Sequence, residues 1–247
     1  MKFNVITIFP DQLLQTLEFG VIGRAIENKI IELNFIDPRE FSDNDYGSID
    51  DKAYGGGPGM VMQVEPILSS IEKVKKESKN NIQTVFLSPQ GEQYTQKHAE
   101  LFKKQSEIII VSGRYEGFDE RVIGLTKNSV EISIGDYVLS GGEIAASVII
   151  DSITRLIPGV LGDEQSAVLD SFTSGLLDHP HYTRPEIVRD KEVPNVLLSG
   201  NHEAIKRWRL KQSIVTTFKK RPDLLKQRKL SKDEQKLLDE YLEELDE

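Results

Sequence analysis

The sequence contains no cysteine among its 247 residues. This absence excludes disulfides, cysteine-based zinc sites, iron–sulfur clusters and thiolate nucleophiles. Long apolar runs are also missing, because the longest, residues 144–150, ends after seven residues even with Ser147 counted in it, whereas a membrane-spanning helix needs roughly 20. Residues 3–9 and the following Pro10-Asp11 have the pattern of a strand and a helix start rather than of a signal peptide. We therefore expect a cytoplasmic protein with no membrane partner.

Acidic residues outnumber basic ones overall, but basic charge gathers in one stretch. The chain has 40 Asp and Glu against 31 Lys and Arg, a net charge of −9, which alone argues against a nucleic-acid partner. Residues 202–229 nevertheless carry ten Lys and Arg and two acids, a net charge of +8, while the last 18 residues carry −6. A basic helical patch is typical of a surface that binds a polyanion. The alternative is a solvated basic helix that pairs with the acidic C-terminal residues.

Apolar periodicity predicts alternating strands and helices over the first 160 residues. The expected strands span residues 3–9, 30–36, 82–87, 108–111 and 130–134, and the expected helices begin near Pro10 and span 65–76, 96–104, 119–125 and 143–157. Such alternation predicts an α/β domain with a mostly parallel sheet.

The second half of the chain begins with a stretch rich in glycine and proline, residues 158–194, which is either a linker or a functional segment. Helical patterns follow at residues 201–220, around Leu224 and from Ser231 onward. Ser231 and Glu234 have the spacing of a capping box that opens the last helix. These patterns predict a small all-α unit.

Four loops that contain glycine lie where strands should end, which is where α/β domains place their sites. They are residues 54–60, 88–91, 113–117 and 134–143. Glycines let backbone amides approach a ligand closely. The first loop breaks the dinucleotide-binding pattern because position 60 is Met, and no P-loop occurs anywhere. A Rossmann-type oxidoreductase or a nucleotide triphosphatase is therefore disfavoured.

Chemistry-bearing residues occur near the junction of the two halves. Arg155 and, 15 residues later, Asp170 could act as an electrostatic clamp and a general base, or form an ordinary surface salt bridge. His179 and His181 could hold a metal, but two histidines without a well-spaced third ligand more often pack or face solvent. The sequence assigns no metal site.

Taken in order along nearly the whole chain, these motifs resemble the bacterial tRNA (guanine-N1-)-methyltransferase (TrmD) family of the SPOUT class. The four loops carry the resemblance together with residues 151–162, 170–172, 175–178, 181–185 and 197–210, the last reading LLSGNHEAIKRWRL. It implies an α/β fold with a SPOUT-type, mostly parallel sheet and a C-terminal trefoil knot, plus a small all-α C-terminal domain. Pattern alone gives an open doubly wound sheet, because knots are essentially absent from ordinary folds. The implied domains are an S-adenosylmethionine-binding domain (1–160), a flexible interdomain segment with the catalytic Asp (161–194) and a helical tRNA-binding domain (195–247).

The resemblance implies methyl transfer from S-adenosylmethionine to N1 of the guanosine at tRNA position 37, next to the anticodon, when the preceding nucleotide is also a guanosine. Asp170 matches the family's general base, and Arg155 matches the residue that stabilises charge developing on O6. The family is homodimeric with its active sites at the subunit interface, and the Asp comes from the subunit opposite to the one that holds the cofactor. Family members depend on Mg²⁺, but the sequence shows no recognisable magnesium site.

Binding residues are implied in the same way. Glu116 matches an acid near the methionine moiety, with a rim carboxylate as the alternative, and Trp208 either stacks on tRNA or packs its own core. Residues 122–132 carry no family motif. The cofactor residues are Ser88, Pro89, Gln90, Gly91, Gly113, Tyr115, Glu116, Gly117, Ser133, Ile134, Gly135, Asp136, Tyr137, Val138, Leu139, Gly141 and Gly142, and the tRNA residues are Asp178, Arg184, Asn201, His202, Lys206 and Arg209.

Two rival functions stay open. A SPOUT enzyme that methylates a ribose 2′-hydroxyl or another base would keep the loops but has no need of the Asp170 segment or of residues 197–210, and both are present. A non-catalytic RNA-binding protein on the same scaffold should have lost Asp170 or the glycine loops, and it has lost neither.

Overall fold

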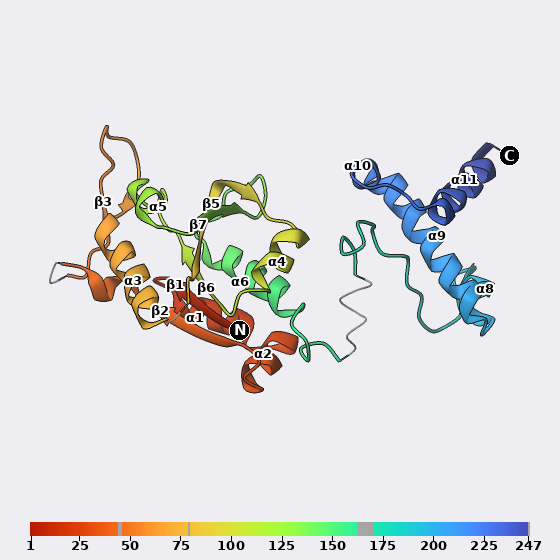
Figure 1. The fold of residues 1–247 in the computed structure, drawn as a ribbon, viewed down its shortest axis with the longest axis horizontal. Coiled ribbons are helices and arrows are strands. Elements are labelled where there is room, and N and C mark those ends of the chain that lie inside the picture. The colour runs from red at the N-terminus through yellow and green to blue at the C-terminus, as the bar shows by residue number, and fades with distance from the viewer. Residues whose placement is uncertain (44–45, 79, 163–169, 247) are drawn as a thin grey trace. The chain divides into compact units, whose positions relative to one another are not determined.

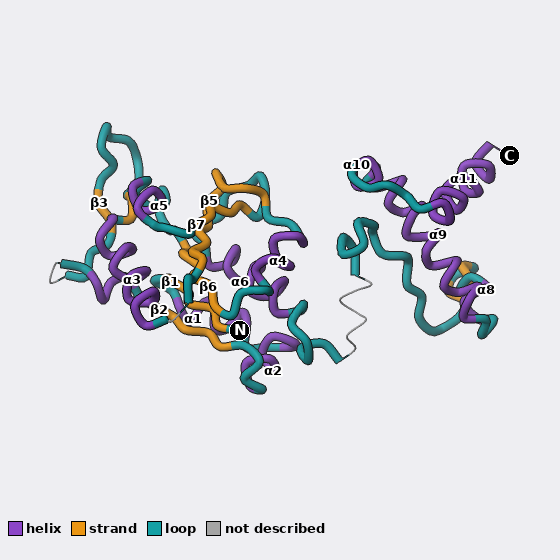
Figure 2. Tube along the Cα trace, in the orientation of Figure 1, coloured by secondary structure: helices purple, strands orange, loops and turns teal. Residues whose placement is uncertain are grey.

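The structure, a computed structural model, describes residues 1–43, 46–78, 80–162 and 170–246. The chain divides into two compact units, Met1–Gly162 and Asp163–Glu247, which Figures 1 and 2 draw with the sheet in the first and a group of helices in the second. The described part of the expected interdomain segment, from Asp170 onward, belongs to the second unit. Among the helices of the described ranges, none combines the length and the apolar character that crossing a membrane requires.

The first unit is built on a five-stranded sheet with the order β2-β1-β6-β5-β7. Every ladder in it is parallel, so all five strands end at one edge. This confirms the predicted fold class, a mostly parallel α/β sheet, while the trefoil knot stays a prediction. The strands are β1 (Lys2–Ile6), β2 (Glu32–Ile36), β5 (Gln83–Gln93), β6 (Glu107–Ser112) and β7 (Ser129–Ser133).

Helices cover both faces of this sheet, which explains why its central strand β6 contains a continuous apolar run, Ile108–Val111. In β6, Ile108 and Ile110 pack on one face, and Ile109 and Val111 pack on the other. The first face is covered by α1 (Pro10–Leu17), α2 (Gly20–Glu27), α4 (Gln96–Phe102) and α6 (Glu143–Thr154). The second is covered by α3 (Val64–Glu77), α5 (Arg121–Leu125) and the 3-10 turn η1 (Pro38–Phe41).

Several elements differ from their expected limits. Helix α2 was not expected, because its two glycines disfavour a helix. Glycine is nevertheless needed at position 23, since a Cβ there would lie 2.1 Å from the Glu18 carbonyl oxygen. A two-residue hairpin of β3 (Asp50–Asp51) and β4 (Val61–Met62) flanks the loop at residues 54–60. Helix α6 ends at Thr154, earlier than expected.

The segment 88–91, expected as a loop, lies within the long strand β5. The register between β5 and β7 shifts between Leu87 and Glu92, so the intervening residues form an irregularity in a continuing strand. A Cβ at Gly91 would lie 2.4 Å from the backbone of Glu131 and Ile132 in β7. Glycine is therefore required for β5 to resume its pairing with β7.

The second unit packs helices α8 (Asn195–Leu198), α9 (His202–Lys220), α10 (Pro222–Lys226) and α11 (Lys232–Asp246) with a short hairpin that was not expected, β8 (Ile187–Val188) and β9 (Lys191–Glu192). The Ser231 amide donates to Glu234 Oε2 at 2.8 Å, and the Glu234 amide donates to Ser231 Oγ at 3.2 Å. These two hydrogen bonds confirm the predicted capping box of α11. The buried core consists of Leu176, Ile214, Val215, Leu237, Leu238 and Tyr241.

Candidate functional site

A cavity of about 370 Å³ lies at the edge of the sheet where β6 and β7 end and where the pairing of β5 is interrupted after Leu87. Three of the predicted glycine loops and the first turn of α6 form its wall. Of the predicted cofactor residues, Gly91 and Asp136 do not line the cavity, and all the others do. Segments far apart in the sequence meet here because parallel strands end at the same edge.

The cavity wall is largely apolar, and its ionisable side chains are acidic. Glu116, Glu120 and Glu131 line it, and among the described residues no Lys or Arg does. Such a wall favours a ligand that carries positive charge and disfavours one that carries phosphates.

Some lining residues were missed by the sequence analysis, namely Leu87, Phe118, Glu120, Ile123, Glu131, Ile132 and Ala145. Leu87 and Phe118 directly flank predicted loops, and Ile132 directly precedes the predicted cofactor residue Ser133. Extending each loop by one residue would have found the first two.

Close backbone contacts join the loops into one wall. The Gly142 amide donates to the Gly113 carbonyl at 2.8 Å, and a Cβ on Gly142 would come within 2.8 Å of Ser112 Cα. The Glu116 amide donates to the Met60 carbonyl at 3.0 Å, which attaches the loop at residues 54–60 next to the cavity. Any side chain at Gly142 would push the loops at residues 113–117 and 134–143 apart.

A buried ion pair lies beneath this wall. Glu143, in the first turn of α6, is 1% exposed, and its Oε2 lies 2.8 Å from Arg114 Nη2. Thr7, just after β1, donates to Glu143 Oε1 at 2.7 Å, and Arg114 also donates to the Ser140 carbonyl at 3.2 Å. The guanidinium lies over the Phe9 ring, 4.4 Å from its centroid. One pair thus connects β1, two cavity loops and α6.

Arg155 lies away from the cavity of its own chain. It caps the C-terminal end of α6, where its amide donates to the Asp151 carbonyl at 3.0 Å. Ala145, at the other end of the helix, lines the cavity. The rise of an α-helix places these two positions about 15 Å apart along the axis. The structure therefore does not bring Arg155 to the predicted cofactor residues within one chain.

Asp170 belongs to the second unit, and the segment that follows it is fixed to the helices of that unit. Leu176 is 4% exposed in the helical core. The Leu177 amide donates to Thr217 Oγ1 on α9, and Arg228 donates to the Ser174 carbonyl, both at 2.8 Å. Residues 163–169, which precede Asp170 in the expected flexible segment, lie outside the described residues.

The predicted tRNA residues lie in the second unit, and two of them share a hollow of about 640 Å³. Arg184 and Arg209 line this hollow together with Tyr182 and Trp208, whose ring centroids are 6.2 Å apart. Trp208 therefore forms part of the wall of the hollow, and the helical core is built from other residues. The remaining predicted tRNA residues do not line it: Asp178 directly precedes the hollow's His179, Asn201 and His202 begin α9, and Lys206 lies further along that helix.

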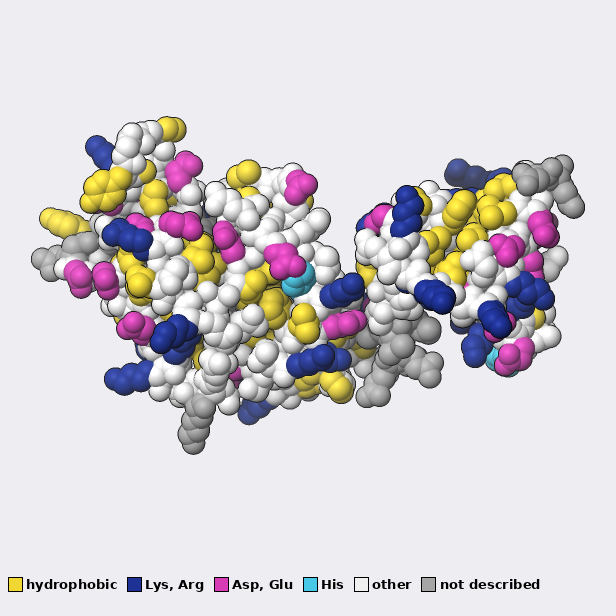
Figure 3. Space-filling view, turned by 45° about the horizontal axis from the view of Figure 1, so that its top comes forward, with side chains coloured by type: hydrophobic (Ala, Val, Ile, Leu, Met, Phe, Trp, Pro, Cys, Tyr) yellow, Lys and Arg dark blue, Asp and Glu magenta, His cyan; other side chains and the backbone are white. Residues whose placement is uncertain are grey.

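Acidic helix α11 neutralises part of the basic charge of α9, so the alternative interpretation of the basic stretch is correct in part. Arg207 donates to Glu240, and Lys211 donates to Glu244 at 2.6 Å. The hydrogen bond from Arg207 is the main cause that lowers the pKa of Glu240. Figure 3 shows acidic and basic side chains next to one another on the second unit. Lys206 and Arg209, by contrast, form no ion pair with any residue of the described part of the chain.

Known proteins match the chain across both units. The sequence profile described as tRNA (Guanine-1)-methyltransferase TrmD matches residues 1–227. The chain belongs to this family. Family membership confirms the resemblance, and the TrmD family is a family of enzymes.

Relatives that carry the name tRNA (guanine-N(1)-)-methyltransferase align over almost their full length. The protein of Marinomonas sp. (strain MWYL1) is 50% identical over 244 residues, 99% of this chain and 97% of the relative. That of Coxiella burnetii (strain Dugway 5J108-111) is 52% identical over 241 residues, 98% of this chain and 97% of the relative. That of Shewanella sediminis (strain HAW-EB3) is 49% identical over 243 residues, 98% of this chain and 100% of the relative.

Proposed function

We propose that this protein transfers a methyl group from S-adenosylmethionine to N1 of the guanosine at tRNA position 37, giving 1-methylguanosine and S-adenosylhomocysteine. The observation that carries the proposal is the glycine-walled, acidic cavity at the carboxyl edge of the sheet, in a chain that belongs to the TrmD family from residue 1 to residue 227. Nothing in the described structure favours ribose methylation or a purely RNA-binding role.

The cavity suits the proposed cofactor in size and in charge. Its volume of about 370 Å³ is in the range of small-molecule sites. S-adenosylmethionine is a cation at its sulfonium and at its amino group, so Glu116 and Glu131 on the wall complement it, while Leu139 and Tyr137 offer apolar surface to the adenine. When bound, S-adenosylmethionine supplies an electrophilic methyl group. Mg²⁺, which the resemblance also implies, has no ligands that we can name.

Two residues perform the proposed chemistry on the guanine. The Asp170 carboxylate accepts the proton of N1, which frees the ring nitrogen to attack the methyl carbon. The negative charge that shifts toward O6 is offset by the guanidinium of Arg155. The base must leave the stack of the anticodon loop to reach these groups.

We further propose a homodimer in which each active site draws on both subunits. About 15 Å of helix separates Arg155 from its own cavity, so a second copy is the natural source of this residue. An apolar surface suitable for association is present, since Leu14 of α1 is 40% exposed and Ile144 and Val148 of α6 are 50% and 44% exposed. Helices α1 and α6 pack against each other, so these side chains belong to one region.

The tRNA would be held by the second unit through cations that α11 leaves available. Lys206 and Arg209 form no ion pair within the described part of the chain, whereas Arg207 and Lys211 pair with α11. Reversing the charge of Lys206 and Arg209 should weaken tRNA binding and flatten its salt dependence, because fewer counterions are released. Reversing the charge of Arg207 and Lys211 is the matched control, because it changes the net charge by the same amount, and it should change the salt slope less. Equal slopes for the two variants would place the tRNA surface elsewhere.

The decisive experiment measures methyl transfer from labelled S-adenosylmethionine to two tRNA transcripts that differ only at position 37. Label recovered as 1-methylguanosine, and only from the transcript with guanosine there, is the expected result. Label on a ribose or on both transcripts would discard the base assignment but keep the cofactor. No label on either transcript, with tRNA still bound, would favour a binding protein.

A subunit-mixing experiment tests the shared active site. Asp170→Asn should bind cofactor but lose most turnover, and Glu116→Lys should lose cofactor binding because it reverses a charge of the cavity wall. If Asp170 acts on the opposite cavity, mixed dimers regain activity, since one of their two sites has both an intact cavity and an intact base. Mixtures that stay as inactive as the separate variants, despite proven exchange of subunits, would contradict the arrangement.

A further inference from the structure

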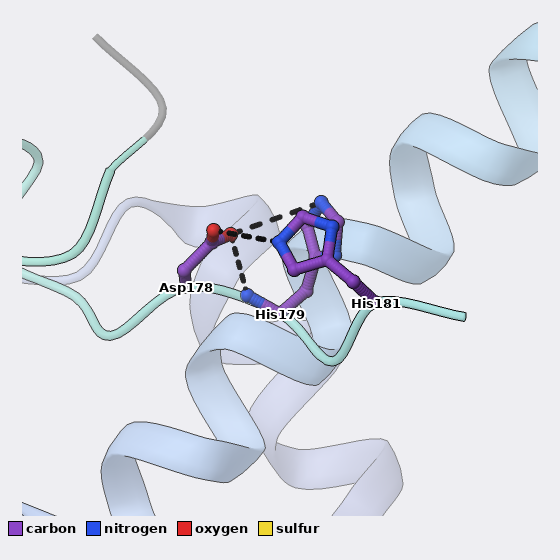
Figure 4. Close-up of side chains that lie close together, drawn as sticks. All are labelled: Asp178, His179 and His181. Carbon is purple, nitrogen blue, oxygen red and sulfur yellow. Dashed lines mark hydrogen bonds and ion pairs between the residues drawn. The ribbon is translucent and has the colours of Figure 1, made fainter. Parts of the chain in front are cut away.

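Three potential metal ligands converge in the second unit, in the segment between the Asp170 loop and the β8–β9 hairpin. Asp178, His179 and His181 point toward one another from a single stretch of chain beside α9 (Figure 4). His181 Nε2 lies 2.8 Å from Asp178 Oδ2, and His179 Nε2 lies 3.8 Å from Asp178 Oδ1. All three ligand atoms lie within 4.8 Å of one another.

We propose that this cluster binds one divalent transition-metal cation of the zinc class, with Asp178 and the Nε2 atoms of His179 and His181 as ligands. Tetrahedral zinc with bonds of about 2.0–2.2 Å holds its ligand atoms about 3.4 Å apart. The separations of 2.8 Å to Oδ2 and 3.8 Å to Oδ1 lie on either side of this value, so rotation of the carboxylate and the two imidazoles is the change that would place all three ligands around one ion.

Neighbouring groups already orient two of the ligands. His179 Nδ1 lies 3.2 Å from the Pro180 carbonyl, and donation there leaves the Nε2 lone pair free for a metal, as in most histidine sites. The Asp178 amide donates to Ser171 Oγ at 2.9 Å, which anchors the carboxylate-bearing residue. The centroids of the Trp208 and His179 rings are 6.4 Å apart, and only 13% of the His179 side chain is exposed.

The third ligand leaves the site open. The side chain of His181 is 70% exposed, so a metal bound here keeps a position for water, as three-ligand sites do. Both imidazoles also line the hollow that contains Arg184 and Arg209. A bound cation would therefore add positive charge to that hollow.

Ligand chemistry separates this site from any magnesium requirement. Imidazole nitrogen suits zinc, cobalt, nickel and copper, whereas magnesium demands oxygen ligands and retains its waters. The inference does not depend on the methyltransferase function, because it rests on the three side chains alone.

Cobalt titration of the full-length, untagged protein after removal of metals provides the test. The chain has no cysteine and four histidines, so few groups compete. We expect one equivalent of Co²⁺ to bind with visible d–d absorption, Zn²⁺ to displace it, and excess Mg²⁺ to leave it in place. Binding should weaken by at least about tenfold in the double variant His179→Ala and His181→Ala, since even the loss of outer-shell groups costs that much.

The matched control is the double variant His98→Ala and His202→Ala, which removes the other two imidazoles of the chain. It should bind Co²⁺ like the unchanged protein, and far-UV circular dichroism should show all three proteins folded. The proposal is overturned if the unchanged protein binds no Co²⁺ or Zn²⁺ at millimolar concentration, or if the His179/His181 variant binds as tightly as the control.

Discussion

The buried pair between Arg114 and Glu143 allows a quantitative prediction for Arg114→Met, which keeps an unbranched apolar stem and removes the guanidinium with its charge. Removing one partner of a buried ion pair costs about 3–5 kcal/mol, because the other charge stays desolvated. Glu143 is 1% exposed, but Arg114 keeps 17% exposure and Thr7 still donates to Glu143. We therefore expect a loss near the lower limit, about 3 kcal/mol.

The two units offer separate spectroscopic signals for this measurement. The single tryptophan, Trp208, lies in the second unit, so its fluorescence reports that unit, whereas far-UV circular dichroism reports both. With a urea dependence of about 2 kcal/mol per molar, a loss of 3 kcal/mol lowers the midpoint by about 1.5 M. The dichroism midpoint of the first unit should shift by this amount, and the fluorescence midpoint should not, at a fixed protein concentration.

Two further variants decide whether the buried charge is the cause. Arg121→Met breaks a 2.8 Å pair with Asp119 in the same unit, but Arg121 is 67% exposed, so its loss should lower the midpoint far less than the loss of Arg114 does. Adding Glu143→Met to Arg114→Met removes the unpaired charge and should restore at least half of the lost stability. A double variant that is less stable than Arg114→Met, or an Arg114→Met midpoint equal to that of Arg121→Met, would refute the reasoning.

Three more outcomes are expected. Gly91→Ala should destabilise the first unit by about 1–3 kcal/mol, because its Cβ would meet the β7 backbone at 2.4 Å. Gly124 lies in open space, so Gly124→Ala should stabilise α5 slightly. Urea unfolding followed by circular dichroism compares the two variants. Leu176→Ala should cost the second unit about 3 kcal/mol and exposed Leu198→Ala almost nothing, as read from tryptophan fluorescence. Burial raises the pKa of Tyr94 to about 12, so this tyrosine ionises at lower pH in the unfolded chain than in the folded one. The free energy of unfolding should therefore fall between pH 10 and 12 by up to about 1.4 kcal/mol per pH unit. Tyr94→Phe should flatten that decline.

The sheet could be predicted because its central strands are buried on both faces and are therefore largely apolar, as in Ile108–Val111. Local composition misled elsewhere. Ser88-Pro89-Gln90-Gly91 has the composition of a turn, but pairing with β7 on both sides of the irregularity keeps it within a strand. Helix α2 begins with Gly20, whose φ of +66° favours glycine, and contains Gly23, where a Cβ would meet the Glu18 carbonyl. Local backbone geometry therefore selects glycine at both positions despite its low helix propensity.

The cavity could be predicted as far as its loops, because a parallel sheet brings strand ends to one edge. The acidic lining residues Glu120 and Glu131 could not be predicted, because a charged residue beside a helix or in a short strand is equally typical of a solvent-facing position. The ion pair between Arg207 and Glu240 joins residues 33 positions apart in the sequence. Opposite charges in the two helices indicate that such pairs can form, but they do not predict which side of α9 is neutralised.

The position of Asp170 links catalysis to tRNA binding in the proposed mechanism. The chain that follows Asp170 is attached to α9 through Leu176 and through the hydrogen bond between Leu177 and Thr217. The proposed base therefore belongs to the unit that carries Lys206 and Arg209, and Arg155 belongs to the unit that contains the sheet. A tRNA that positions the second unit would position the base with it, so weakening the Leu177 contact by Thr217→Val should lower kcat more than it lowers the affinity for S-adenosylmethionine. Equal losses in both would show that the contact serves general stability, and unchanged kcat would detach Asp170 from the helical unit.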